Sequence, residues 1–93
     1  SAAQAQTALV TIDLQQEKMV QVMDEIENQT KYLFIYDKNM DTGRLVNVHV
    51  NKRPVAEALD QMVKGTDVVY EIQGSNIILT VRSQQTDGPK VML

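Results

Sequence analysis

Several residue types and patterns on which common functions depend are scarce in this sequence of 93 residues. It contains no cysteine, which excludes a disulfide scaffold, a cysteine-ligated metal site and a thiol nucleophile. It contains only four glycines and no glycine-rich loop that could hold a phosphate group. No apolar run approaches the roughly 18 residues that a membrane-spanning helix requires, so we expect no membrane span in this sequence.

The charge balance argues against nucleic acid as a partner. Nine basic and twelve acidic residues give a net charge of −3, so there is no general attraction for nucleic acid or anionic lipid. The sequence has neither a basic stripe nor a Gly-x-x-Gly loop. Its four aromatic residues, Tyr32, Phe34, Tyr36 and Tyr70, are expected to pack inward from strands rather than to stack on bases. We therefore expect no nucleic-acid partner.

What the sequence does contain is an internal repeat of its apolar residues. Residues 10–36 align without a gap on residues 46–72, at an offset of 36. Each segment has 13 apolar residues, and 12 of them coincide, although only three aligned positions are identical. The chain length suits one domain, so the repeat predicts two copies of one structural unit within it.

Each copy predicts a strand, a helix and a second strand. Strict alternation of apolar and polar residues over residues 10–14 and 46–50 predicts two strands that bury one face. Apolar residues at i, i+3, i+4 and i+7 then predict two amphipathic helices, with stripes formed by Met19, Val22, Met23 and Ile26, and by Val55, Ala58, Leu59 and Met62.

Runs rich in strand-forming residues, 32–36 and 68–72, close the two copies. A polar turn around Gly74 joins the second run to a final strand over residues 77–81. The predicted fold class is α+β, with two β-α-β repeats, a final hairpin strand, and helices packed against sheet.

None of the polar residues forms a pattern that predicts chemistry. His49 is the single histidine, and the alternation places it on the solvent side of its strand without further metal ligands. The loop over residues 37–43 resembles the start of a calcium-binding loop, but its glycine stands seventh instead of sixth and the twelfth position is Val48. The carboxylates on the helices are expected to be solvated: Asp24, Glu25, Glu27, Glu57 and Asp60. We expect no catalytic residue, metal or cofactor, and a binding or structural module rather than an enzyme.

The order of these residues resembles the secretin and TonB N-terminus (STN) domain over residues 9–81. One specific motif is the helix that ends in Glu27-x-Gln29-Thr30 before an aromatic strand. The other is the helix of residues 54–60, Pro-Val-x-Glu-Ala-Leu-Asp, followed by Lys-Gly-Thr at 64–66. The sequence is similar to the copies in SusC-like TonB-dependent outer-membrane receptors. Residues 1–8 are then expected to be a flexible leader, and residues 82–93 a linker or tail.

The resemblance implies a periplasmic domain whose two helices lie between a two-stranded and a three-stranded sheet. In a TonB-dependent receptor, an outer-membrane protein, such a domain binds the periplasmic part of an anti-sigma regulator and couples ligand uptake to transcription; the rest of the receptor chain is its second partner. In a secretin the related domain helps to assemble the channel, and this alternative stays open. Neither role implies a catalytic residue or a cofactor.

The same topology predicts where a partner would bind. If it pairs the first strands of the two repeats, Asp13 and His49 become neighbours on one solvent-exposed face. Three nearby polar residues would complete the patch, which gives five candidate partner-binding residues: Asp13, Gln15, Asn47, His49 and Asn51. The alternative, which the sequence alone favours, is that these are ordinary solvated strand positions.

Overall fold

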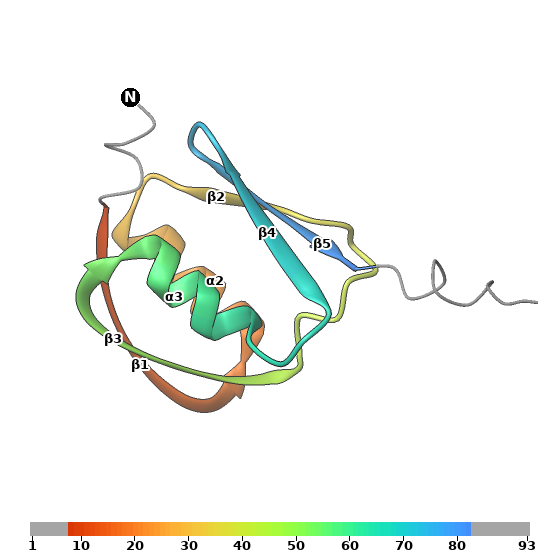
Figure 1. Ribbon diagram of the computed structural model, residues 1–93, viewed down its shortest axis with the longest axis horizontal. Helices are drawn as coiled ribbons and strands as arrows, with labels where there is room; N and C mark the ends of the chain where they lie inside the picture. Colours follow the sequence, from red (N-terminus) through yellow and green to blue (C-terminus); the bar gives the residue numbers. More distant parts are fainter. Residues whose placement is uncertain (1–7, 83–93) are drawn as a thin grey trace, which may run out of the picture.

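Two helices are packed between two separate sheets in the computed structural model, which describes residues 8–82 (Figure 1). No helix in this part of the chain is both long and apolar enough to span a bilayer. The elements follow one another as β1 Leu9–Lys18, α2 Met19–Gln29, β2 Leu33–Ile35, β3 Leu45–Pro54, α3 Val55–Val63, β4 Val68–Gln73 and β5 Asn76–Val81.

The two sheets combine strands from both repeats. β1 and β3, the first strands of the repeats, form an antiparallel two-stranded sheet. The second strands, β2 and β4, flank β5 in a three-stranded sheet, in which β2 is parallel and β4 antiparallel to β5. The predicted α+β fold with a two-stranded and a three-stranded sheet is confirmed, and neither repeat forms a sheet of its own.

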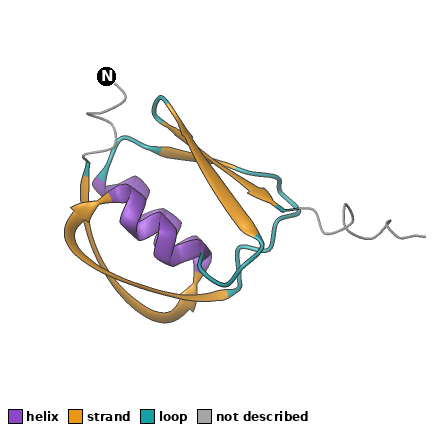
Figure 2. Cartoon of the chain, in the orientation of Figure 1, coloured by secondary structure: helices purple, strands orange, loops and turns teal. Residues whose placement is uncertain are grey.

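β1 and β3 are longer than the alternation of apolar residues predicts. Both continue beyond residues 14 and 50 through a β-bulge, where Gln16 has φ 54° and Lys52 has φ 55°. The two bulge residues are 36 positions apart, so the repeat extends to the backbone conformation. A bulge adds one residue to a strand and breaks its alternation, which is why the sequence pattern ends before the strand does. The bulges increase local twist, and β1 and β3 curve around the helices (Figure 2).

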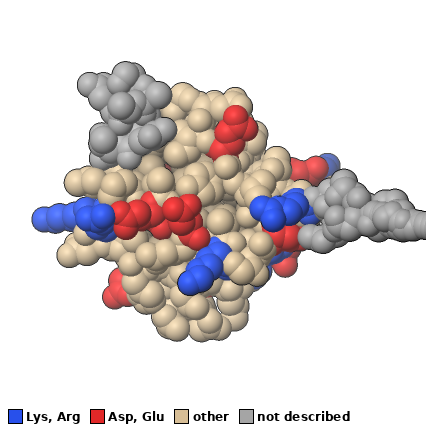
Figure 3. Space-filling view, in the orientation of Figure 1, with Lys and Arg blue, Asp and Glu red and all other residues tan. Residues whose placement is uncertain are grey.

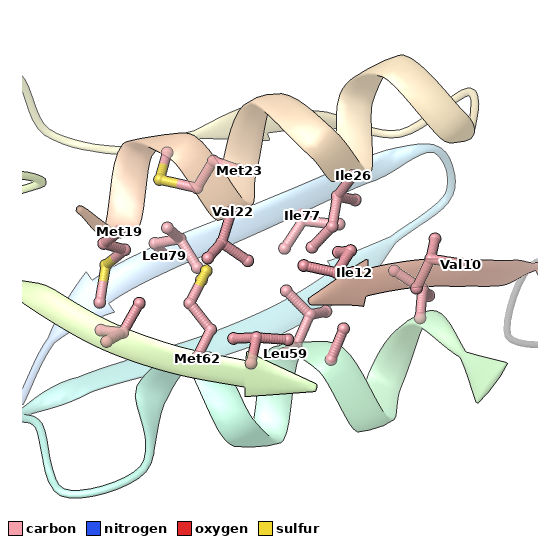
Figure 4. Packing of buried hydrophobic residues seen from close by; sticks show 14 of the residues in the cluster. Val10, Ile12, Met19, Val22, Met23, Ile26, Leu59, Met62, Ile77 and Leu79 are labelled. Atoms are coloured by element: carbon pink, nitrogen blue, oxygen red, sulfur yellow. The ribbon is translucent and has the colours of Figure 1, made fainter. Parts of the chain in front are cut away.

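The core lies between the sheets and is filled from both helices. All eight residues of the two predicted helix stripes are buried, and those that Figure 4 labels lie beside Ile77 and Leu79 of β5 and Ile12 of β1. The expectation for the aromatic residues is wrong for Tyr36, which is 39 % exposed because β2 already ends at Ile35.

One of the identical positions in the repeats has the same structural role twice. The Thr30 hydroxyl donates to the Ile26 carbonyl at 2.7 Å and accepts the Tyr32 N–H at 3.0 Å. The Thr66 hydroxyl donates to the Val63 carbonyl at 2.6 Å and accepts the Val68 N–H at 3.0 Å. Each threonine therefore binds a carbonyl near the end of its helix and fixes the turn into the following strand.

Tyr70 ties the three-stranded sheet to α3. Its hydroxyl donates to Asp60 Oδ1 at 2.6 Å. Burial raises the pKa of Tyr70 to about 12, and the hydrogen bond to Asp60 and the charge of this carboxylate act in the same direction. The bond requires a protonated phenol, so it is lost when Tyr70 ionises.

This coupling predicts a loss of stability at alkaline pH. The unperturbed pKa is 10.0 and the folded-state pKa is about 12. The contribution of Tyr70 to the free energy of unfolding is therefore complete below the unperturbed pKa and is lost as pH rises through the folded-state pKa. Across this pH range, the free energy of unfolding measured in urea should depend less steeply on pH for Tyr70→Phe than for the unaltered chain. The exposed Tyr36→Phe is the matched control and should keep the original slope; equal slopes for all three chains would contradict this account.

The packing of the core predicts that the same substitution, leucine to alanine, has very different effects on the free energy of unfolding at two positions. Leu59 is fully buried and Leu33 is 60 % exposed. Leu59→Ala leaves a cavity and should lower the free energy of unfolding by about 2–5 kcal/mol. Leu33→Ala should change it by less than about 0.5 kcal/mol. Urea denaturation measures both, and similar losses would show that the packing between the sheets differs from that described.

Candidate docking surface on the two-stranded sheet

The predicted partner-binding residues all lie on the outer face of the β1–β3 sheet, and all five are exposed. Asp13 and His49 are direct partners in the strand register, as the predicted pairing requires. Between these outward side chains, Ile12 and Val50 turn into the core. The alternation that builds the core therefore also builds an outer face that is polar. We call this face, formed by the five residues and Thr11, the polar face.

Three of the five residues form one connected cluster. His49 Nδ1 lies 2.6 Å from Asp13 Oδ1, and His49 Nε2 lies 2.7 Å from Gln15 Oε1. Both ring nitrogens thus lie within hydrogen-bonding distance of a side chain on β1. The cluster remains open to solvent, with 49 % of the His49 side chain and 86 % of the Asp13 side chain exposed.

The other two predicted residues lie at the bulges. Asn47 Oδ1 accepts the backbone N–H of Gln16 at 2.7 Å. At the equivalent bulge, the Thr11 hydroxyl accepts the backbone N–H of Lys52 at 3.0 Å and donates to Asn51 Oδ1 at 3.4 Å. A bulge removes an amide from the regular ladder, and here the side chain opposite each bulge supplies the acceptor. Asn47 is therefore a structural residue as well as an exposed one.

Two glutamines whose structural role the sequence does not predict hold the outer edges of the sheet. Gln29 Oε1 accepts the Thr11 N–H at 2.9 Å, and its Nε2 donates to the Thr11 carbonyl at 2.8 Å. On the opposite edge, Gln61 Oε1 accepts the His49 N–H at 2.7 Å, and its Nε2 donates to the His49 carbonyl at 3.3 Å. Each side-chain amide pairs with a strand as a neighbouring peptide group would. A glutamine on the polar side of a helix gives no signal of this role in sequence.

Several of the helix carboxylates, expected to be solvated, also accept hydrogen bonds. Glu27 Oε2 accepts the Phe34 N–H at 2.9 Å, and Glu25 accepts a bond from Gln29 at 3.1 Å. Arg53 Nη2 lies 2.6 Å from Glu57 Oε2, and the hydrogen bond between them lowers the pKa of the Glu57 carboxyl. Acidic and basic side chains also alternate over the face shown in Figure 3, without an extended area of one sign.

The loop with partial likeness to a calcium site uses its carboxylates for its own backbone. Asp37 Oδ1 accepts the Asn39 N–H at 2.7 Å, and Asp41 Oδ1 accepts the Gly43 N–H at 2.9 Å. These are the side-chain-to-backbone bonds that stabilise polar turns. Across residues 8–82, no three acidic or histidine side chains are grouped closely enough to hold a metal ion.

A shallow hollow of about 380 Å³ lies on the polar face. It is lined by Thr11, Asp13, His49 and Asn51, together with Ile12 and Val50. Polar groups around a hollow can fix the orientation of a partner side chain that enters it. The polar face therefore offers shape as well as hydrogen-bonding groups.

Comparison with known proteins gives the family to which this fold belongs. Residues 32–84 match the family described as the secretin and TonB N terminus short domain. This match spans more than half of the sequence, and the chain belongs to that family. No curated protein sequence matches the chain.

A crystal structure shows the same fold. It is that of the ferripyoverdine receptor of the outer membrane of Pseudomonas aeruginosa bound to ferripyoverdine, with a TM-score of 0.64 and 16 % sequence identity. The similarity covers 85 % of this chain but 10 % of the receptor chain. At this identity the likeness establishes the fold alone.

The bulge contacts predict that substitutions at two residues of the polar face lower the free energy of unfolding by different amounts. Asn47→Ala removes the acceptor for the Gln16 N–H and should lower the free energy of unfolding by about 1 kcal/mol. His49→Ala removes an exposed contact and should change it by less than about 0.5 kcal/mol. Urea denaturation of the two variants checks this; a larger loss for His49→Ala would show that the cluster, and not the bulge, supports the sheet.

Proposed function

We propose that this chain is the N-terminal periplasmic domain of a TonB-dependent outer-membrane receptor. In this role it binds the periplasmic part of an anti-sigma regulator and couples ligand uptake to transcription. The observation that carries the proposal is the family match over residues 32–84. It is supported by the fold shared with an outer-membrane receptor, of which a domain of this size is only a small part.

The construction of the polar face supports binding there. Opposing strands are joined by the contacts of His49, and the bulges are held by Asn47 and Thr11. Side chains that are already ordered lose less conformational entropy when a partner binds. The polar face is also free of the helices, which pack on the other side of the sheet. We therefore assign Asp13, Gln15 and His49 as the centre of the binding surface, with Asn47 and Asn51 at its ends.

The proposed domain includes one residue on either side of residues 9–81. The Ala8 carbonyl accepts the Val55 N–H at 2.8 Å, and the Arg82 N–H donates to the Asp67 carbonyl at 2.6 Å. We propose that a leader precedes Ala8 and that a linker to the remainder of the receptor follows Arg82. The segments 1–7 and 83–93 lie outside the described residues.

The family description also names secretins, so a periplasmic assembly domain of a secretin channel is the second candidate. The sequence that follows this domain in the full-length gene separates the two candidates. A plug and a β-barrel receptor support the first candidate, whereas repeated ring-building domains support the second.

Charge reversal on the polar face should weaken binding of the regulator. The binding constant of the 93-residue chain for the periplasmic part of the regulator is measured by calorimetry. Asp13→Lys and His49→Glu should each weaken it by about tenfold or more. Glu71→Lys, an exposed reversal on β4 of the other sheet, is the matched control and should leave it unchanged.

The outcomes separate the function from the surface. If the unaltered chain does not bind the regulator, the signalling role is wrong. If it binds and neither reversal on the polar face weakens the complex, the role stands and the assignment of Asp13 and His49 is wrong.

A further inference from the structure

The outer edge of β3 presents backbone groups that face away from β1. Val46 and Val48 are the register partners of Glu17 and Leu14 on β1. Because backbone groups alternate along an antiparallel strand, those of Leu45, Asn47 and His49 point to the open side. The bonds from His49 to Gln61 confirm this direction. The edge is therefore a row of peptide groups that a further strand could meet.

Gln61 holds this edge less firmly than Gln29 holds the edge of β1. Both bonds of Gln29 to Thr11 are 2.9 Å or shorter, and its amide also donates to Glu25 at 3.1 Å. Gln61 makes one short bond to His49, and its second bond is 3.3 Å long. Its side-chain amide offers the same donor and acceptor as a backbone peptide group. A peptide group of another strand could therefore replace it and make the same two kinds of hydrogen bond to His49.

A hollow of about 660 Å³ runs beside this edge of β3. Its lining includes Leu45, Asn47, His49 and Gln61, together with Lys64 at the end of α3. Leu45 is 58 % exposed, so its side chain is accessible to a partner. Lys64 brings a positive charge to this lining, and no ion pair found within residues 8–82 includes it. The hollow thus combines a backbone edge, an apolar contact and a positive charge.

We propose that the outer edge of β3 accepts an extended segment of the regulator as a third strand of the β1–β3 sheet. Gln61 occupies the edge in the free domain and is displaced from His49 by a peptide group of the incoming segment. The proposal rests on the proposed function and specifies the mode of binding. Alternate side chains of an added strand face the same way, so the segment carries an apolar residue against Leu45 and an acidic residue near Lys64.

Two matched glutamine variants test the displacement. Synthetic peptides that together cover the periplasmic part of the regulator are titrated against the 93-residue chain. Gln61→Ala frees the edge and should strengthen binding of the responsive peptide by about three- to tenfold. Gln29→Ala, the same change on the edge of β1, should leave the affinity unchanged. Lys64→Glu should weaken binding by about tenfold.

Amide hydrogen exchange in the complex locates the added strand. The amides of Leu45, Asn47 and His49 should exchange at least about tenfold more slowly when the peptide is bound. Binding with slowed exchange at β4 or β2 instead, or a Gln61→Ala variant that binds no more tightly, would overturn the β3 proposal and leave the signalling role intact. Protection of the β3 edge by a second copy of the chain alone, seen as self-association in sedimentation, would also overturn it. If neither the peptides nor the whole periplasmic part of the regulator binds, the proposed function itself fails.

Discussion

The structure depends on burying the apolar stripes of two helices that neither repeat can cover alone. Each repeat supplies one helix, but its two strands go to different sheets, so both sheets contain strands from both repeats. The helices are enclosed only when the repeats come together, with Leu59 and Met62 of α3 and Val22 and Ile26 of α2 fully buried. The outer faces of both sheets follow from this arrangement, because every residue that turns inward directs its neighbours outward.

The β1–β3 sheet shows how this constraint produces a polar outer face. A sheet of only two strands has two open edges, and it must curve to cover the helices. Bulges at Gln16 and Lys52 provide curvature, and Asn47 and Thr11 accept the amides that the bulges release. Gln29 and Gln61 reach from the helices to the edges. Asn47 and Thr11 thus complete the hydrogen bonding of the sheet and also belong to its polar face.

Much of the fold could be predicted from the sequence because apolar periodicity reports burial directly. The helix stripes, the order of elements and the final hairpin all follow from it, and the facing of Asp13 and His49 followed once the family topology was added. The bulges could not be predicted, since Gln16 and Lys52 are not residues typical of a positive φ. The roles of Gln29 and Gln61 were also inaccessible, because they depend on contacts 18 and 12 residues away. Tyr36 was misplaced because alternation does not indicate where a strand ends.

We expect the two-stranded sheet to be the part of this domain that the regulator contacts. Backbone amide chemical shifts, recorded by NMR while the periplasmic part of the regulator is added to isotopically labelled domain, test this most directly. The perturbed amides should cluster on β1, on β3 and at the end of α3 near Lys64. Perturbations confined to β2, β4 and β5, with the shifts of Asp13 and His49 unchanged, would contradict it.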